Sequence, residues 1–300
     1  MTSSTDGTQR LAVVTGASSG IGAATVRELA SRGYYVLAGV RRPEDADALR
    51  SVNIEPVLLD ITDEGAIAAL AQRIRNDAGH RHLGALVNNA GMAVNTPLET
   101  YPLAEWRRLF EVNLFGHVAM TQALLPALIE SGGTIVNISS VGGRMAMPTY
   151  GPYAATKFAL EAVSDALRRE TAHLGVGVVV IEPGAVSTGM LQQVGERGAK
   201  VIDAMTPSQR GRYAGLMRAV VAQADASVAG GAPPEKVART VADAITSARP
   251  STRYAVGRGI SAIIGLTRLL SDRALDRLLS ANLKPYFPKA SPAKEVAGEA

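Results

Sequence analysis

Short, almost continuously apolar runs alternate with helix-length segments along most of this 300-residue chain. Six runs are rich in β-branched residues and bounded by Gly, Pro, Asn or Asp, and a plausible seventh follows: 11–16, 34–40, 54–60, 83–89, 133–139, 176–183 and 252–257. Strands without polar alternation are typical of a parallel sheet buried on both faces. Helix-length segments lie between them, at 20–32, 63–79, 102–130 and 151–174. The alternation predicts an α/β fold with a doubly wound parallel sheet of about seven strands and helices on both faces.

Composition excludes several classes of protein. The 31 basic and 27 acidic residues leave a net charge of +4 that is spread along the chain, so we expect no nucleic-acid partner. The absence of cysteine excludes disulfides and thiolate chemistry and fits a reducing compartment. The N-terminal MTSSTDGTQR carries no apolar signal core, and no apolar run reaches the roughly 20 residues of a membrane helix. We therefore expect a soluble, cytoplasmic protein without integral membrane association.

A glycine-rich turn, TGASSGIG at 15–22, follows the first strand candidate and directly precedes the first helix candidate. Its three glycines permit a tight turn and a close approach of the backbone to a ligand. The start of the following helix offers unpaired N–H groups and a positive dipole end to a pyrophosphate. A glycine turn by itself can be only a turn, but this strand–turn–helix predicts a dinucleotide site. We expect these residues of the loop to contact the cofactor: Gly16, Ser18, Ser19, Gly20, Ile21 and Gly22.

The end of the second strand candidate distinguishes between the two nicotinamide dinucleotides. An acidic residue there would hydrogen-bond the ribose 2′-hydroxyl of NAD. The chain instead reads YYVLAGVRRPED, with Arg41 in that turn. An arginine can fork onto a 2′-phosphate with a charge-assisted contact worth about 1.5–3 kcal/mol. Arg41 therefore favours NADP. Two alternatives stay open: Arg41 and Arg42 could be a solvated pair, and Glu44 or Asp45 could serve NAD.

Tyr153 and Lys157 occupy positions i and i+4 of a predicted helix, in TYGPYAATKFAL at 149–160, and no other lysine lies within forty residues of Lys157. Side chains at this spacing share a helix face. A lysine ammonium would stabilise the phenolate and lower the tyrosine pKa from its usual value of about 10. The pair could then exchange a proton with an alcohol or carbonyl near neutral pH. The alternative is an ordinary helix start at the surface.

Ser140 follows the fifth strand candidate, where an open α/β sheet binds ligands, so its hydroxyl could hold the oxygen that Tyr153 protonates. With these residues the chain carries an ordered set: TGASSGIG, Asp60 in LLDIT, NNAG at 88–91, Asn113 in EVNLFG, Ser140, YAATK at 153–157 and EPGAVSTGM at 182–190. In order and spacing this set resembles the short-chain dehydrogenase/reductase family, in its single-domain branch. The resemblance implies a Rossmann-type fold.

The resemblance also implies roles for the matching residues. Tyr153 would be the general acid in reduction and the base in oxidation, while Ser140 would hydrogen-bond the reacting oxygen. Lys157 would lower the tyrosine pKa and hold the nicotinamide ribose, and Asn113 would anchor a water that links Lys157 to solvent. Further positions would line the cofactor: Asp60 and Ile61 at the adenine, Asn88, Asn89, Ala90 and Gly91 at the adenine-side ribose, Val186 and Thr188 at the carboxamide and phosphates, with Pro183 and Gly184 in the same segment.

One residue departs from the pattern of some NADP-binding relatives. They have a lysine or arginine just before the middle glycine of the loop, whereas this chain has Ser19. Recognition of a 2′-phosphate would therefore depend mostly on Arg41. The cofactor would carry the hydride, and the protein would supply alignment and the proton.

No internal repeat and no Pro/Gly-rich linker interrupts the middle of the chain, so we expect one domain over residues 1–300. Residues 10–188 would form the cofactor-binding and catalytic core. Residues 189–260 would form a partly helical substrate lid with the last helix and strand. Residues 261–300 would form a C-terminal extension, amphipathic after 260, with a disordered tail.

The substrate would contact loops at the carboxyl edge of the sheet, where Met92, Val94, Met145 and Met147 supply apolar, adaptable side chains or plain packing. The C-terminal third looks like that of retinol and hydroxysteroid dehydrogenases, which implies a lipophilic alcohol or ketone such as a steroid or retinoid. The four histidines show no metal-ligand spacing, so we expect no metal.

Relatives of this fold assemble through long helices, so a homodimer or homotetramer is expected, and the amphipathic C-terminal segment could contact a membrane surface or a partner subunit. Two alternative functions stay open: an NAD-linked dehydrogenase of a small alcohol, and a non-catalytic protein that senses NADP. The presence of both Tyr153 and Lys157 argues against the second.

Overall fold

Seven strands form one parallel sheet in the computed structural model, which describes residues 9–189 and 194–288. The strands are β1 (Leu11–Val14), β2 (Tyr35–Val40), β3 (Ile54–Leu58), β4 (Leu83–Asn88), β5 (Thr134–Ile138), β6 (Gly177–Pro183) and β7 (Arg253–Val256). Their order is β3-β2-β1-β4-β5-β6-β7, and every neighbouring pair is parallel. The predicted doubly wound sheet is confirmed, and the strand candidates differ from these bounds only at their ends.

The strand order reverses between β1 and β4, which are neighbours in space although β2 and β3 lie between them in the chain. From β1 the chain proceeds outward through β2 and β3, then returns to β4 and proceeds outward to β7 on the other side. In such sheets a crevice opens at the reversal, beyond the carboxyl ends of the strands. The topology therefore places a ligand site beside the ends of β1 and β4.

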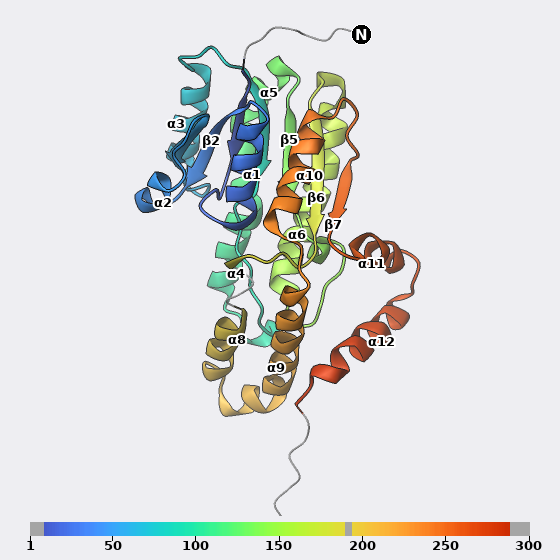
Figure 1. Ribbon diagram of the computed structural model, residues 1–300. Coiled ribbons are helices and arrows are strands. Elements are labelled where there is room, and N and C mark those ends of the chain that lie inside the picture. Colours follow the sequence, from blue (N-terminus) through green and yellow to red (C-terminus); the bar gives the residue numbers. More distant parts are fainter. Residues whose placement is uncertain (1–8, 190–193, 289–300) are drawn as a thin grey trace, which may run out of the picture.

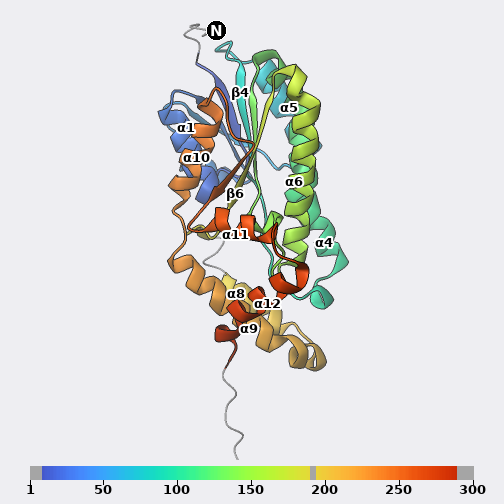
Figure 2. The same ribbon diagram turned by 90° about the vertical axis from the view of Figure 1, so that its right-hand side faces the viewer.

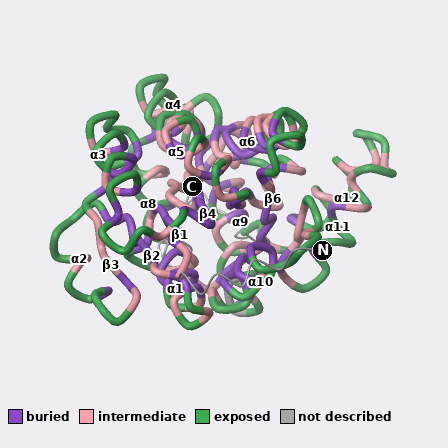
Figure 3. The backbone as a smooth tube through the Cα atoms, turned by 90° about the horizontal axis from the view of Figure 1, so that it is seen from above, coloured by how far each residue is buried: buried purple, intermediate pink, exposed green. Residues whose placement is uncertain are grey.

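Helices cover both faces of the sheet (Figure 2). One face carries α1 (Gly20–Ser31) and α10 (Pro234–Thr246), with the short α2 (Pro43–Asp47) near β3. The other face carries α3 (Glu64–Arg75), α4 (Leu103–Phe110), α5 (Gly116–Ser131) and α6 (Gly151–Thr171). Separate apolar clusters fill the two interfaces, and Figure 3 shows the buried segments concentrated along the strands and the inner sides of the helices. Burial on both faces explains why the strands lack polar alternation.

The long helix expected at 102–130 runs from Leu103 to Ser131. Within it a π-helical turn, η2 (Glu111–Phe115), lies between α4 and α5 and contains Asn113. Among the described residues this is the one helix long and apolar enough to cross a membrane by length and composition, although it contains no uninterrupted apolar run of that length. In the fold α5 packs against β4 and α3, so its apolar character belongs to the helix layer of the sheet.

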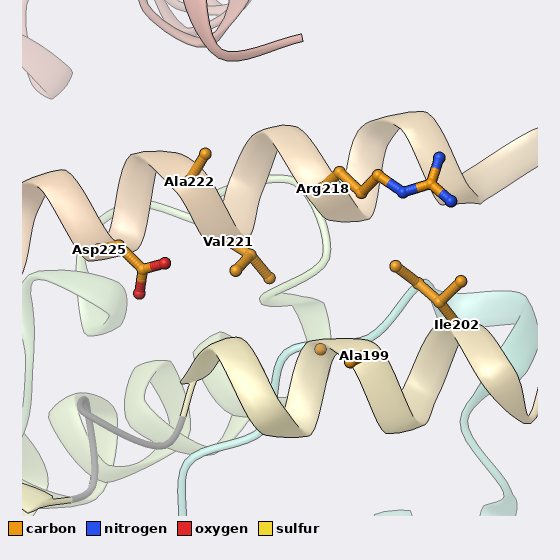
Figure 4. Close-up of a pocket in the computed structure, with 7 residues that line it drawn as sticks. Ala199, Ile202, Arg218, Val221, Ala222 and Asp225 are labelled. Carbon is orange, nitrogen blue, oxygen red and sulfur yellow. The ribbon is translucent and has the colours of Figure 1, made fainter. Parts of the chain in front are cut away.

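Two helices lie beyond the carboxyl ends of the strands, α8 (Val194–Asp203) and α9 (Pro207–Ala229) (Figure 1). They enclose a cleft of about 310 Å³ that is walled mostly by small and apolar residues, with Arg218 and Asp225 on α9 (Figure 4). The amphipathic segment after residue 260 forms α11 (Ile260–Thr267) and α12 (Asp272–Leu283). Short 3-10 turns complete the chain: η1 (Leu98–Thr100), η3 (Val141–Gly143), η4 (Ala172–Leu174) and η5 (Lys284–Tyr286). The tail predicted to be disordered lies, from residue 289, outside the described residues.

Candidate active site

The glycine-rich loop after β1 adopts a backbone that other residues would strain. Gly16 and Gly20 have φ angles of +65° and +55°, in the left-handed region that favours glycine. A Cβ on Gly22 would lie 2.2 Å from the Gly16 carbonyl oxygen, and one on Gly16 would lie 2.7 Å from Ala90 Cα. The glycines thus let the loop close on itself and on the segment after β4. This is a cradle of backbone that fits a pyrophosphate.

The start of α1 presents this cradle to an anion. Ser19 is the N-cap residue and makes no side-chain capping bond within the described chain, and the first turn of α1 contains no acidic residue. Ser18 and Ser19 are exposed, Gly20 and Ile21 are half-buried, and Gly22 is buried. Thr188 lies against the loop, because a Cβ on Gly20 would be 3.1 Å from its Cγ2. The free N–H groups and the helix dipole therefore remain available to phosphate oxygens.

Thr15 and Asn89 hold this loop in place; sequence reasoning gave Thr15 no role of its own and included Asn89 only in the stretch 88–91 at the ribose. The Thr15 hydroxyl accepts hydrogen bonds from the backbone N–H groups of Asn89 and Ala90, each at 3.0 Å. The Asn89 side-chain amide donates to the carbonyls of Thr15 and Gly16, at 2.9 and 3.1 Å. The loops after β1 and β4 are thus joined across the crevice. In the sequence, the position of Thr15 directly before Gly16 and that of Asn89 within NNAG were the signals that could have indicated this role.

The two arginines after β2 differ in their contacts. Arg42 donates two hydrogen bonds to Asp45, at 2.7 and 2.9 Å, and lies at the exposed edge of the sheet. Arg41 is exposed and makes no ion pair with any described residue, while its charge contributes to lowering the pKa of Asp45 and of Asp60. Asp45, one of the two acids that kept NAD open, is thus already paired with Arg42, while Glu44 is exposed. Arg41 remains the arginine with its guanidinium available to a ligand.

The residues predicted near the adenine separate into exposed and buried positions. Asp60 is exposed. Burial raises its pKa, but the backbone N–H and hydroxyl of Thr62 outweigh this and lower it overall. Ile61 is buried beneath α5, where a Cβ on Gly116 would lie 2.8 Å from its side chain. Asp60 therefore presents polar atoms at the surface of the crevice, while Ile61 supports its wall.

Asn88 lies deeper than the predicted contact with a ribose requires. It is fully buried, and its side-chain amide donates to Asn137 Oδ1 at 2.9 Å and to the Thr121 hydroxyl at 3.2 Å. Asn137 in turn donates to the Ser164 hydroxyl at 2.8 Å. The amide of Asn88 thus joins β4 to β5 and α5, and its predicted contact with the ribose stays a prediction. Ala90 and Gly91, which follow, are half-buried at the crevice.

Asn113 is locked at the π-helical turn between α4 and α5. Its Oδ1 accepts from Met92 N at 2.8 Å, while its Nδ2 donates to Met92 O at 2.9 Å and to the Thr156 hydroxyl at 3.1 Å. These bonds use the whole amide and join η2 to α6 and to the segment after β4. Short π-helical turns within helices are frequent at functional sites. Beside the glycine-rich loop, the π-helical backbone at 111–115 is therefore a further indication of a functional site here.

Ser140, Tyr153 and Lys157 meet beyond the ends of β5 and β6. Ser140 Oγ accepts from Gly142 N at 3.0 Å and lies 3.5 Å from the Pro183 carbonyl. A Cβ on Gly142 would be 3.3 Å from the Tyr153 ring and 3.4 Å from Ser140 Oγ, so this glycine keeps the two side chains close. Lys157 Nζ lies 5.9 Å from the centre of the Tyr153 ring. The three predicted residues thus form one group.

The segment after β6 completes this side of the crevice. Gly184 N donates to the Val256 carbonyl at 2.9 Å, and Val186 pairs with Ala232 in an isolated bridge. Pro183 and Val186 are buried, whereas Gly184 and Thr188 are half-buried. This backbone runs from Ser140 to the glycine-rich loop, where Thr188 contacts Gly20. The nine-residue motif of the sequence ends at Met190, which lies outside the described residues.

The ionisation of the Tyr153–Lys157 pair differs from the expectation. Burial raises the pKa of Tyr153 above its usual value, against the hydrogen bond with Ser140. Burial lowers the pKa of Lys157 to about 8. The predicted lowering of the tyrosine pKa is therefore not present in the protein alone, because Lys157 Nζ donates to the Ile138 carbonyl at 2.8 Å and not to the phenol. The phenol is thus held protonated at neutral pH.

His117 is buried next to this group, although the sequence indicated only an ordinary surface or packing role for it. Its Nε2 lies 2.7 Å from the Ala90 carbonyl, and its Nδ1 has no hydrogen-bond partner among the described residues. Burial, with the charge of Lys157, lowers its pKa to about 3. Neutral His117 thus supports the segment after β4. Within residues 9–189 and 194–288, no group of three His, Asp or Glu side chains is close enough to hold a metal ion.

Comparison with known proteins identifies this constellation. The family model described as short chain dehydrogenase matches residues 10–199. The NADPH-dependent 3-dehydrocapnine reductase of Ornithobacterium rhinotracheale is 35% identical over 92% of this chain and 98% of its own. Retinol dehydrogenase 7 of Rattus norvegicus is 34% identical over 81% of this chain and 79% of its own. A short chain dehydrogenase from Burkholderia cenocepacia, solved in complex with NADP, superposes with a TM-score of 0.68 at 27% identity, covering 95% of this chain and 98% of its own.

The chain belongs to the short-chain dehydrogenase/reductase family. Its relatives place it with the members of retinol and hydroxysteroid dehydrogenase type. It is an NAD(P)-dependent oxidoreductase with a Rossmann-type sheet that acts on small molecules. The resemblance inferred from the ordered motifs is confirmed.

Proposed function

We propose that this chain interconverts an alcohol and a ketone or aldehyde on a lipophilic substrate, with NADP(H) as cofactor and Tyr153 as acid and base. One observation carries the proposal: Ser140, Tyr153 and Lys157 form a single group at the crevice that the glycine-rich loop also borders. A proton donor and a nucleotide cradle at one sheet edge suit the reduction of a carbonyl.

The protein's own residues would handle the proton. Ser140 would hydrogen-bond the substrate oxygen and fix its distance from the phenol. Tyr153, held protonated by burial, would donate its proton to the oxygen during reduction. Lys157, with a pKa of about 8, is largely charged at neutral pH and would stabilise the phenolate that remains. Asn113 would hold η2 and α6 in register, so that a water there could return the proton.

NADPH, when bound, would supply the hydride, and the glycine-rich loop and Arg41 would hold it. The loop would bind the pyrophosphate through backbone N–H groups, and the free guanidinium of Arg41 would bind the 2′-phosphate. Asp60 and the Ala90–Gly91 backbone would border the adenosine, while Gly184 and Thr188 would border the nicotinamide end. NADPH in the name of one relative and NADP in the structure of another support this preference over NAD.

The lipophilic substrate is inferred from the crevice walls and from the name of one relative. Met92, Val94, Met145 and Met147 are half-buried in the loops after β4 and β5. Such apolar, flexible side chains suit an extended hydrocarbon. One relative is named as a 3-dehydrocapnine reductase and another as a retinol dehydrogenase, and the second name supports a lipophilic alcohol. We further propose one domain, with residues 10–188 as core, 189–260 as substrate lid with the last helix and strand, and 261–300 as C-terminal extension, in a cytoplasmic homodimer or homotetramer.

A substrate panel tests the proposal. Purified protein is mixed with NADPH or NADH and with steroid, retinoid and long-chain ketones beside short ones such as acetone, and the loss of reduced-cofactor absorbance is followed. We expect turnover of at least one long apolar ketone with NADPH, at a kcat/KM about 10-fold or more above that with NADH. Turnover only of short ketones, or a preference for NADH, would contradict the proposal and favour an NAD-linked dehydrogenase of a small alcohol.

A further inference from the structure

Four charged side chains meet in the interior behind the candidate active site, and the mechanism above uses none of them. Glu161 lies on α6 and Glu182 on β6, while Arg144 follows η3 and Arg253 begins β7. The two glutamates are 5% and 3% exposed. Two buried carboxylates side by side are costly unless cations and hydrogen bonds replace the water that they lose. A cluster of this kind, one helical turn from Lys157, calls for a role.

Each arginine contacts both carboxylates. Arg253 Nε lies 3.0 Å from Glu161 Oε2 and 3.5 Å from Glu182 Oε1. Arg144 Nη1 lies 3.7 Å from Glu161 Oε2, and its Nε lies 3.6 Å from Glu182 Oε1. The cluster therefore ties the loop after Ser140 to α6, β6 and β7. These are the segments that carry or adjoin every residue assigned to proton transfer.

Glu161 is also the charged neighbour of Lys157 on the same helix. The two residues are at i and i+4, the spacing at which opposite charges stabilise each other. Lys157 is 5% exposed, and its Nζ donates to the Ile138 carbonyl at 2.8 Å. Glu161 Oε1 is buried without a hydrogen-bond partner among the described residues, since both arginines approach Oε2. Glu161 thus acts on the lysine through its charge, since no hydrogen bond joins the two side chains.

Of the ionisable groups around Lys157, only Glu161 adds a charge that acts on the lysine pKa. Burial lowers the pKa of Lys157 to about 8, and the charge of Glu161 opposes that shift. From α5, His117 is neutral and adds no charge, because its pKa is lowered to about 3. From α6, Tyr153 is protonated. Glu161 is therefore the anion that counteracts the cost of burying the ammonium.

Glu182, the second carboxylate of the cluster, has a different balance. Its burial and the charge of Glu161 raise its pKa, while Arg144, Arg253 and Arg268 act against that rise. Arg144 and Arg253 thus contact both glutamates, so the two carboxylates share the same cations.

We propose that Glu161 is a positioning residue for the Tyr153–Lys157 pair: fixed by Arg144 and Arg253, its carboxylate keeps the buried lysine ammonium charged at neutral pH. The inference rests on the proposed function only for what the lysine does in turnover. The charge state of Lys157 itself can be measured in the protein without any substrate.

Nuclear magnetic resonance of protein labelled with ¹³C at lysine Cε measures that charge directly. The chain has six lysines, and a Lys157→Arg variant identifies the signal of Lys157. We expect Glu161→Gln to lower the titration midpoint of Lys157 by about one pH unit, because the opposing anion is lost. We expect Glu161→Asp, which keeps the carboxylate, to restore part of that midpoint. The control Glu170→Gln, at an exposed position of the same helix, should leave it unchanged.

Glu161→Asp separates this role from simple packing, because it also disturbs the cluster but keeps the anion. Equal shifts in Glu161→Gln and Glu161→Asp, or an unchanged midpoint in folded Glu161→Gln protein, would overturn the inference. Should Glu161→Gln fail to fold, the wild-type midpoint of Lys157 decides: one above pH 7 supports the inference, and one at or below pH 7 overturns it. In turnover, the alkaline limb of the kcat/KM profile should move with the midpoint. If the midpoints shift as expected while reduction proves independent of Tyr153, the proposed function fails and the charge assignment of Glu161 stands.

Discussion

The two halves of the sheet build their parts of the site by different means. On the β1–β3 side, the cofactor cradle consists of backbone, and its geometry depends on glycines that leave no room for a side chain. On the β4–β7 side, the site depends on buried polar side chains such as Asn113, Lys157 and Glu161, each held by partners distant in sequence. The first half is therefore sensitive to added volume, and the second to lost charge or a lost hydrogen bond.

The largest effect is expected where volume is added to the first half. In Gly22→Ala, the new Cβ would lie 2.2 Å from the Gly16 carbonyl oxygen, so the loop must move. Overpacking of this kind costs about 1–3 kcal/mol of folding free energy or more. We also expect cofactor affinity to fall beyond detection, because the loop carries the pyrophosphate site. Urea unfolding and a fluorescence titration with NADPH measure the two effects.

A matched glycine provides the control for this comparison. Gly215 lies within α9, and a Cβ added to it would meet no atom of the described residues within 4 Å outside its own stretch of helix. Gly215→Ala should stabilise the protein by about 0.5–1 kcal/mol, because alanine favours the helix, and should leave NADPH binding intact. Equal NADPH affinity in Gly22→Ala and wild type would show that the cradle does not depend on its glycines.

A smaller effect is expected when a charge is removed at the rim of this first half. Arg41→Ala should weaken NADPH binding about 10- to 100-fold and leave NADH binding unchanged, because only NADPH carries the 2′-phosphate. Arg42→Ala is the matched control: its guanidinium is already committed to Asp45, so less than about a twofold change in NADPH affinity is expected. Isothermal titration with both cofactors measures this. Intact NADPH affinity in Arg41→Ala would assign 2′-phosphate recognition elsewhere.

The same contrast explains what could be predicted from the sequence. The strands, the glycine-rich loop and the group of Ser140, Tyr153 and Lys157 follow from local patterns, and the structure brings the last three together as expected. The burial of the Asn88 amide could not be predicted, because its partners Asn137 and Thr121 come from a strand and a helix distant in sequence. The partners of Asn113, Met92 and Thr156, are likewise distant in sequence.

The direction of the Tyr153 pKa shift could not be derived from an i, i+4 spacing. The spacing shows that Tyr153 and Lys157 share a face of α6, but the Ile138 carbonyl that holds the ammonium belongs to β5. Burial of the phenol then dominates its pKa. Glu161 follows Lys157 at the same i, i+4 spacing. Its role could not be recognised from that spacing, because its ion-pair partners come from β7 and from the loop after Ser140.

The most direct test of proton delivery by Tyr153 is the rate of hydride transfer in a Tyr153→Phe variant saturated with NADPH and the best ketone of the panel. Single-turnover absorbance, with cofactor affinity measured in parallel, separates chemistry from binding. We predict a rate about 10²–10⁴-fold below wild type with NADPH affinity within about twofold, because only the donated proton is lost. A Tyr153→Phe rate equal to that of wild type would contradict the assignment.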